Sequence, residues 1–252
     1  STLSVTYDIT PPTVSLSSTA PSYTNTSPIP VAVTFSESVT GVTLSDFSVT
    51  NGTAGNLTGS GTSYTVDITP AGNGLVEVSI GSAAASDLAG NGNTSSNTLS
   101  RTYDTVRPTV TVSTTASAAT NVAPIPITVT FSESVTGFTV EDLSVVNGSA
   151  SNFVAVSGTI YTADVTPTLE GVVTVSIAAA VAVDVAINDN LVSNSLSVTY
   201  DITPPTVSLS STAASTTNTS PIPVSILFSE STSDFTISDV TVVNGTAGSF
   251  VG

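Results

Sequence analysis

Short runs in which apolar and polar residues alternate are the main pattern along this chain. The run Ile29–Phe35 has an apolar side chain at every second position, and so does the run from Tyr64 to Ile68. Alternation with a period of two predicts strands that bury one face and expose the other. Gly, Pro and Asn stand between the runs, as they do in turns. The pattern therefore predicts an all-β protein.

The first hundred or so residues contain enough such runs for one complete β-sandwich. The predicted strands are Thr13–Ser17, Ile29–Phe35, Val42–Val49, a weak strand around Asn56–Gly59, Tyr64–Ile68, Leu75–Ile80 and Thr98–Thr102. The third strand changes the parity of its apolar positions at Asp46, which a β-bulge or a short turn would explain. Seven short strands of this kind are typical of an immunoglobulin-like sandwich. We expect Phe35 and Tyr64 to fill its centre, because the chain has no Cys and no Trp.

The same pattern recurs with a period of about 97 residues. Leu3–Ala20 and Leu196–Ala213 are identical over 18 residues, and the string Phe-Ser-Glu-Ser begins at Phe35, Phe131 and Phe228. Self-similarity at a fixed period indicates a repeat architecture. The predicted divisions are the last strand of a preceding repeat at 1–7, Ig-like repeats at 8–103 and 104–200, and the N-terminal half of a third repeat at 201–252. We expect a window of a longer array, in which the half repeat is not stable alone.

Proline marks the joints between the predicted repeats. Pro11-Pro12 and Pro204-Pro205 stand just before the first strand of a repeat. Proline fixes its own φ and favours an extended conformation in the residue before it. The joints are therefore expected to be short and stiff, and the sandwiches to form a linear array.

Composition excludes several classes of function. The chain has 2 Lys+Arg against 18 Asp+Glu, a formal net charge of −16, and neither Cys nor His. Without Cys and His there is no thiolate nucleophile, no Ser–His pair and no structural zinc site. The negative charge repels phosphate backbones, so no nucleic-acid partner is expected. No apolar run reaches roughly 18 residues, so no membrane insertion is expected.

Carboxylates are expected to gather at one pole of each sandwich. The first strand runs away from the incoming linker and the second runs back, so the linker, the B–C loop and the F–G loop share one end. The residues predicted to meet there are Asp8, Glu37, Asp87 and Asn91 in the first repeat, Asp104, Glu133, Asp184 and Asn188 in the second, and Asp201 and Glu230 in the third. Asn93 and Asn190 lie in the same F–G loops and are expected to join them.

A bound cation would relieve the repulsion within such a cluster. Ca²⁺ takes six to eight oxygen ligands and suits clustered carboxylates, whereas the absence of His and Cys disfavours zinc and copper. The sequence therefore predicts a structural Ca²⁺ ion at each inter-domain joint, where it would lock the angle between repeats. The alternative is a set of solvated loop carboxylates.

The remaining charges have simpler expected roles. Asp46, Asp142 and Asp239 stand where the third strand changes parity, and they either cap a turn or join the cation site. Arg101 and Arg107 flank Asp104 and are expected to pair with it, which at the surface contributes at most about 1 kcal/mol.

Several motifs together resemble bacterial Ig-like repeats. They are Asp-Ile-Thr-Pro-Pro-Thr-Val from Asp8, Phe-Ser-Glu-Ser-Val-Thr-Gly from Phe35 and Asp-Leu-Ala-Gly-Asn from Asp87. Such repeats form long extenders in large secreted adhesins and biofilm-associated surface proteins. The resemblance implies an extracellular location at the bacterial cell surface and Ca²⁺ between modules. The second repeat departs from the motif, because Ile187 replaces Gly90, and its loop is expected to hold a cation differently.

These observations favour a structural extender, or stalk, of an adhesin, with neighbouring repeats of the same longer chain as its partners. The alternative is a subunit of a self-assembling extracellular filament or surface layer, with other copies of the chain as partners. A carbohydrate-binding module or glycoside hydrolase is disfavoured, because the aromatic residues fall at core positions of strands and leave no platform for a sugar. No enzymatic activity is expected.

Overall fold

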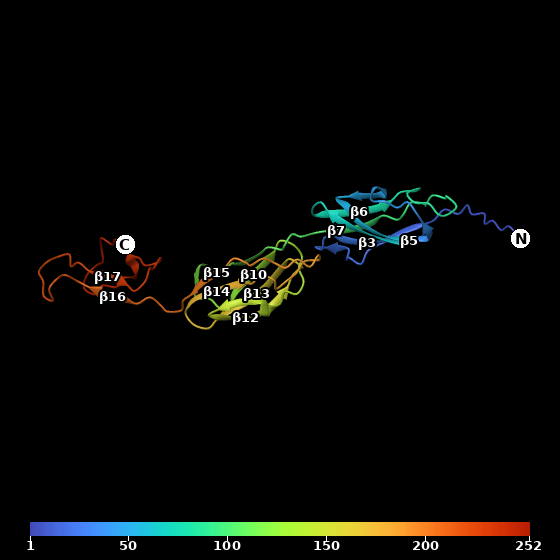
Figure 1. Cartoon of the computed structure of the whole chain (residues 1–252). Helices are drawn as coiled ribbons and strands as arrows, with labels where there is room; N and C mark the ends of the chain where they lie inside the picture. The colour runs from blue at the N-terminus through green and yellow to red at the C-terminus, as the bar shows by residue number, and fades with distance from the viewer. The chain divides into compact units, whose positions relative to one another are not determined.

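The computed structural model describes all residues, 1–252. The chain divides into a unit at Ser1–Tyr200, which contains two β-sandwiches, and a unit at Asp201–Gly252 (Figure 1). The predicted all-β fold of tandem Ig-like sandwiches is confirmed. No helix of the chain has the length and apolar character needed to cross a membrane.

The first sandwich packs a sheet of order β1-β3-β5 against a sheet of order β2-β7-β6-β4. The strands are β1 (Val14–Ser17), β2 (Tyr23–Thr24), β3 (Ile29–Val39), β4 (Phe47–Thr50), β5 (Gly52–Pro70), β6 (Gly74–Ile80) and β7 (Leu99–Tyr103). All pairings are antiparallel except the parallel pairing of β2 with β7.

The second sandwich repeats this arrangement with sheets of order β12-β13-β10-β8 and β11-β14-β15-β9. The strands are β8 (Val110–Thr114), β9 (Ala119–Thr120), β10 (Ile125–Phe131), β11 (Leu143–Val146), β12 (Gly148–Ala155), β13 (Ile160–Pro167), β14 (Gly171–Ile177) and β15 (Leu196–Tyr200). The short strand β9 pairs in parallel with β15, as β2 does with β7.

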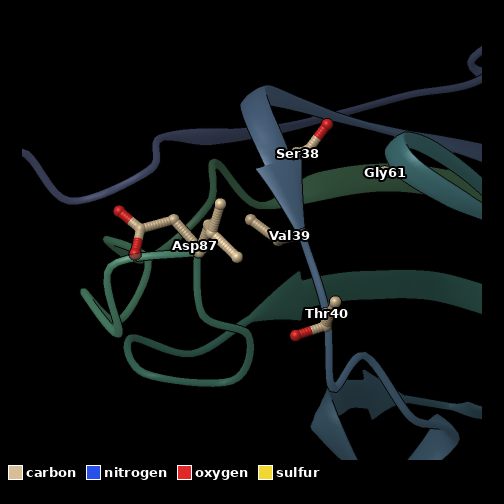
Figure 2. Close-up of a pocket in the computed structure, with 6 residues that line it drawn as sticks. Ser38, Val39, Thr40, Gly61 and Asp87 are labelled. Atoms are coloured by element: carbon tan, nitrogen blue, oxygen red, sulfur yellow. The ribbon is translucent and has the colours of Figure 1, made fainter. Parts of the chain in front are cut away.

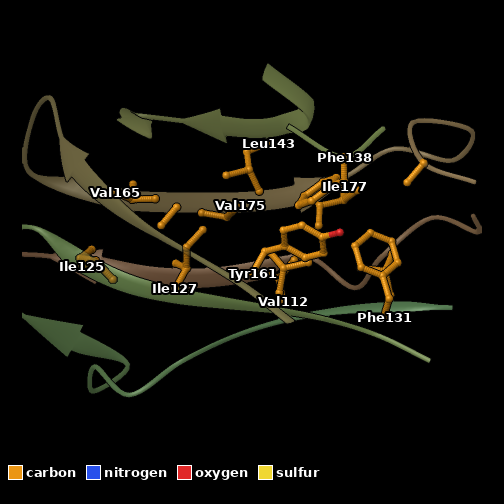
Figure 3. Packing of buried hydrophobic residues seen from close by; sticks show 14 of the residues in the cluster. Val112, Ile125, Ile127, Phe131, Phe138, Leu143, Tyr161, Val165, Val175 and Ile177 are labelled. Atoms are coloured by element: carbon orange, nitrogen blue, oxygen red, sulfur yellow. The ribbon is translucent and has the colours of Figure 1, made fainter. Parts of the chain in front are cut away.

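The core lies between the two sheets of each sandwich, on the apolar side of the alternating strands. In β3 the burial alternates residue by residue, and Val31 and Val33 are each 1% exposed. Phe35 and Tyr64 meet edge to face with ring centroids 6.0 Å apart, as predicted. In the second sandwich Phe131 and Tyr161 gather with Phe138 at one end of the core (Figure 3). Edge-to-face aromatic pairs add about 0.5–1.5 kcal/mol each beyond their buried area.

Three details of the predicted strands are corrected by the structure. The run Val42–Val49 is not one strand, because a 3-10 turn at Leu44–Asp46 (η1) precedes β4, and this turn explains the change of parity. The weak strand at Asn56–Gly59 is continuous with the next one in β5. The two-residue strand β2 was not predicted, since a pair of residues is too short to show alternation.

The unit at Asp201–Gly252 contains the hairpin-like pair β16 (Val207–Ser210) and β17 (Ser225–Phe228), followed by a 3-10 turn at Ile237–Asp239 (η3). Val207 and Leu209 are 56% and 70% exposed, whereas Val14 and Leu16, their counterparts in β1, are 7% and 5% exposed. The apolar face of this unit has no second sheet against it.

Residues 1–13 form no strand. Leu3 and Val5 are 93% and 81% exposed, so the predicted strand at 1–7 contacts no other strand here. Its assignment to a preceding repeat stays a prediction.

Candidate metal centre

The first carboxylate cluster draws one side chain from each of three chain segments. Asp8 lies in the linker before β1, Glu37 in the second half of β3, and Asp87 in the loop after β6. Their carboxylate oxygens all lie within 4.8 Å of one another. Asp87 is buried and the other two are half-buried. The structure thus brings together three residues that are 29 or more positions apart in the sequence.

The second cluster has the same composition at the start of the second sandwich. Asp104 belongs to the linker after β7, Glu133 follows β10, and Asp184 lies in the loop after β14. Their carboxylate oxygens again lie within 4.8 Å of one another, and Asp184 is 2% exposed. Asp104 is therefore both the joint between two sandwiches and a member of the cluster.

A short turn fixes each linker aspartate. The backbone N–H of Thr10 donates to Asp8 Oδ1 at 2.9 Å, and the N–H of Val106 donates to Asp104 Oδ1 at the same distance. Asp201 accepts from Thr203 N–H in the same way at 3.0 Å. An aspartate that bonds the backbone two residues on is an Asx turn. The linker carboxylates are therefore held in place before any cation binds.

An asparagine in the F–G loop holds the buried aspartate of each cluster. Asn91 Nδ2 donates to Asp87 Oδ2 at 2.8 Å and to the Asp8 carbonyl at 3.2 Å. Asn188 Nδ2 does the same to Asp184 Oδ2 at 2.9 Å and to the Asp104 carbonyl at 3.0 Å. These asparagines join the loop to the linker. The prediction that their side-chain oxygens bind a cation stays a prediction.

The electrostatics of the clusters show unrelieved negative charge. Burial raises the pKa of Glu37, and the charges of Asp8 and Asp87 raise it further. Burial likewise raises the pKa of Glu133, with added contributions from Asp184 and Asp104. By contrast, the Asn91 side-chain hydrogen bond lowers the pKa of Asp87 and keeps that carboxylate ionised. In each cluster the glutamate is thus the carboxyl group whose ionised form is the least favourable. A divalent cation would stabilise that ionised form.

A pocket of about 500 Å³ lies beside the first cluster. It is lined by Ser38, Val39, Thr40, Gly61, Asp87 and Leu88. Figure 2 shows the carboxylate of Asp87 turned away from Val39 and Thr40. The pocket therefore borders the stem of Asp87 and does not enclose the carboxylate cluster.

Asn93 and Asn190 do not join the clusters as predicted. Asn93 accepts from Ala85 N–H and donates to the Gly81 and Thr94 carbonyls. Asn190 has the corresponding hydrogen bonds in the second sandwich. Asn93 is 2% exposed and Asn190 is 0% exposed. The hydrogen bonds of both side chains therefore hold the F–G loop in its conformation.

The predicted pairing of Arg101 and Arg107 with Asp104 is wrong. Arg101 donates to the carbonyls of Ser18, Ala20 and Ser100, and Arg107 donates to the carbonyls of Asp189 and Asn190. Each arginine therefore donates to backbone carbonyls of its own sandwich and not to the Asp104 carboxylate. The second cluster is left without a neutralising cation from the chain.

The aspartates at the parity change cap turns, which was one of the two predicted roles. Asp46 Oδ2 accepts from Thr43 N–H at 2.7 Å and from Thr43 Oγ1 at 2.8 Å. Asp142 and Asp239 make the same contacts with the threonines three residues before them. None of the three belongs to a carboxylate cluster.

Asp201 and Glu230, predicted for a third site, form no three-carboxylate cluster in the structure. The first two repeats take their third carboxylate from the loop after β6 or β14, and residues 201–252 contain no counterpart of that loop. A cation site at Asp201 and Glu230 stays a prediction.

Two asparagines at the joint were missed by the sequence analysis. Asn25 Nδ2 donates to the Asn188 side-chain oxygen and to the Ile187 carbonyl, both at 3.1 Å. Asn73 Oδ1 accepts from Thr105 N–H at 3.1 Å and from Thr105 Oγ1 at 3.0 Å. The signal for Asn25 was present, because Asn121 and Asn218 follow it at the spacing of the repeat.

The family model for the bacterial Ig-like domain matches the chain at residues 8–103, 104–200 and 201–252. No curated protein sequence is significantly similar to the chain.

Solved structures with similarity to the chain include three that cover most of its length. The crystal structure of invasin, a bacterial integrin-binding protein, has 14% identity and a TM-score of 0.39 over 80% of this chain and 42% of its own. The Yersinia pseudotuberculosis adhesin InvE has 16% identity and a TM-score of 0.28 over 76% of this chain and 59% of its own. The D0-D1 domain of intimin has 16% identity and a TM-score of 0.23 over 74% of this chain and 97% of its own. The chain thus spans about half the length of the first two.

Proposed function

This chain belongs to the bacterial Ig-like domain family, and from that premise we propose that it is a stalk segment of a bacterial adhesin, stiffened by Ca²⁺ at the joints between repeats. Its role is structural and non-catalytic, its place is the extracellular face of a bacterial cell, and its partners are neighbouring repeats of the same chain. The family match supports the assignment of each repeat as an Ig-like domain. The calcium-dependent stiffness goes beyond that match and is proposed here.

The observation that carries the proposal is the double role of Asp104. This residue connects β7 of the first sandwich to β8 of the second, and its carboxylate lies within 4.8 Å of those of Glu133 and Asp184. A cation bound by all three would tie the linker to two loops of the second sandwich. The linker could then no longer rotate freely. The joint would be rigid, as a stalk requires.

The charge and ligand chemistry suit Ca²⁺. Three ionised carboxylates carry a charge of about −3 and supply up to six oxygens, and backbone carbonyls and waters can complete a shell of six to eight. The cluster has no Arg or Lys partner, so the cation would be its main source of neutralisation. Mg²⁺ demands a tighter octahedral shell and gives up its waters reluctantly, so it should bind more weakly.

Thermal unfolding of the 252-residue chain with Ca²⁺, with Mg²⁺ and with a chelator tests the proposal. A ligand at 100 times its Kd stabilises the folded state by about 2.7 kcal/mol per site. For a domain of about 100 residues this raises Tm on the order of 10 °C. We expect that increase with Ca²⁺ and little with Mg²⁺. An unchanged Tm at millimolar Ca²⁺ would mean that the clusters are solvated carboxylates only.

A pair of variants tests whether an increase in Tm comes from Ca²⁺ binding at the clusters. Asp184→Asn removes one ligand charge from the second cluster, whereas Asp164→Asn changes a carboxylate outside the clusters, whose Oδ2 accepts a hydrogen bond from Asn152 Nδ2. Ca²⁺ should stabilise the Asp164→Asn chain as it does the wild type and should lose its effect on the second sandwich in Asp184→Asn. Equal responses would contradict the proposed site. Sedimentation of the same samples tests the filament alternative, which predicts that copies of the chain associate.

A further inference from the structure

The joint between the first two sandwiches contains a contact that the proposed function does not use. Strand β2 pairs in parallel with β7, with Thr24 opposite Tyr103. Asn25 directly follows β2, and Asp104 directly follows β7. The N–H of Asp104 also donates to the Thr24 carbonyl at 3.0 Å. This pairing therefore carries Asn25 to the side of the linker aspartate.

From this position Asn25 reaches the F–G loop of the second sandwich. Its Nδ2 donates to the Ile187 carbonyl and to Asn188 Oδ1, both at 3.1 Å. Asn188 in turn donates to Asp184 Oδ2 at 2.9 Å and to the Asp104 carbonyl at 3.0 Å. Hydrogen bonds in a chain polarise and strengthen one another. A continuous path of hydrogen bonds thus runs from the first repeat to a buried carboxylate of the second.

The contact requires a hydrogen-bond donor in the side chain at position 25. Both partners of Asn25 are oxygens, so an aspartate could not replace it, and alanine would leave Asn188 Oδ1 without its donor. Asn25 is half-buried and Asn188 is 7% exposed, so water competes poorly for these groups. An unsatisfied acceptor in such a place costs more than an exposed one.

The same residue recurs in each repeat. Asn121 directly follows β9, as Asn25 follows β2, and Asn218 stands 97 residues further on. Both are exposed, and residues 201–252 contain no F–G loop for Asn121 to bind. We infer that Asn25 and its counterparts form the docking contact of each repeat, and that their partner is the F–G loop of the following repeat. Through Asn188, Asn25 acts as a positioning residue for the second carboxylate cluster. This coupling to cation binding rests on the proposed function, whereas the docking does not.

The metal-free chain tests the docking by itself. Asn25→Ala should shift the backbone amide resonances of residues 184–190, which belong to the second sandwich, as well as those next to the substitution. Asn121→Ala is the matched control, since it removes the same side chain after β9, and it should leave every F–G loop unchanged. Unperturbed core resonances verify that both variants fold. If Asn25→Ala alters only the first sandwich, the docking contact does not exist.

A Ca²⁺ titration followed by the same resonances tests the coupling. In Asn25→Ala the second cluster should bind Ca²⁺ about three- to tenfold more weakly, which is the scale of one net hydrogen bond, while the first cluster keeps its affinity. Asn121→Ala should change neither cluster. Equal affinities in the wild type and Asn25→Ala would overturn the positioning role. If the wild type takes up no Ca²⁺ but the loop shifts are seen, the proposed function fails, the coupling fails with it, and the docking stands.

Discussion

The two carboxylate clusters have the same three side chains in different surroundings. In the first, Asn91 holds Asp87 and no hydrogen bond reaches the Asn91 side-chain oxygen. In the second, Asn188 holds Asp184 and also accepts from Asn25 of the preceding repeat. The carboxylates define where a cation could sit in both. The difference teaches that each repeat holds its own carboxylates through the loop asparagine, and that the second loop also receives a hydrogen bond from another repeat.

The F–G loops differ at one further position. Gly90 has a φ of +90° in the first loop, and Ile187 has a φ of +69° at the same place in the second. Both loops keep the same turn, since the N–H of each residue donates to the carbonyl of the loop aspartate at 3.3 Å and 3.2 Å. The expectation that the second loop holds a cation differently stays a prediction. In that loop a β-branched residue takes the left-handed conformation, and the second loop carries the strain.

The largest expected effect comes from a core substitution that destabilises the second sandwich and leaves the first unchanged. Ile177 is 0% exposed in β14 of the second sandwich. Ile177→Ala removes buried methyl groups and leaves a cavity, which costs about 2–5 kcal/mol. The second sandwich should unfold at a lower denaturant concentration while the first keeps its midpoint. A single transition that moves as a whole would show that the sandwiches unfold as one unit.

A somewhat smaller effect compares the clusters directly. Asp87→Asn should remove Ca²⁺-dependent stabilisation from the first sandwich, and Asp184→Asn from the second, each by about 2.7 kcal/mol at 100 times the Kd. Calorimetry of both variants with and without Ca²⁺ measures the loss. Asp67→Asn on the outer face is the control for Asp87→Asn. A loss that spreads to both sandwiches in either variant would contradict two separate sites.

A substitution at the loop position should relieve strain in the second sandwich only. Non-glycine residues in the left-handed conformation cost about 1–2 kcal/mol. Ile187→Gly should therefore stabilise the second sandwich by about 1 kcal/mol, less the entropy that glycine adds to the unfolded chain. Gly90→Ala, the reverse test in the first loop, should destabilise. Chemical denaturation measures both, and the same sign in the two variants would refute this explanation.

The smallest expected effect concerns pH in the metal-free chain. Because the pKa of Glu133 is raised in the folded protein, the folded state binds more protons than the unfolded state above pH 4.5, and stability falls as pH rises through the folded pKa. Glu133→Gln should flatten that slope and stabilise the metal-free second sandwich by a few tenths of a kcal/mol near neutral pH. Glu37→Gln should flatten the corresponding slope of the first sandwich. A slope that persists in both variants would assign the protons to other groups.

Much of the fold could be predicted because its signals are local. Alternation marked β1 and β6 almost to the residue, since each of these strands buries every second side chain. The bounds of β7 were predicted equally closely, although its side chains are only half-buried or exposed. The strand order of the sandwich then placed the linker and two loops at one pole. That argument was enough to identify all six carboxylates that the structure groups into clusters.

The hydrogen-bonding role of each polar side chain could not be predicted in the same way. Asn91 and Asn93 stand two residues apart in one loop, yet only Asn91 contacts the cluster. Arg101 and Asp104 are close in sequence, yet the guanidinium bonds carbonyls more than 80 positions away. A polar group binds whichever partner the fold brings within reach, and spacing in the sequence does not contain that information.

By itself the sequence determined the repeat, the strands and the carboxylates that share a pole, because each follows from periodicity or from the order of strands along the chain. Only the tertiary structure decided that β2 runs beside β7, that Asn25 thereby meets Asn188, and that the arginines leave the clusters without a neutralising charge. These contacts join residues from about 80 to more than 160 positions apart. They exist because folding brings segments that are distant in the sequence together and because buried polar groups must find partners there.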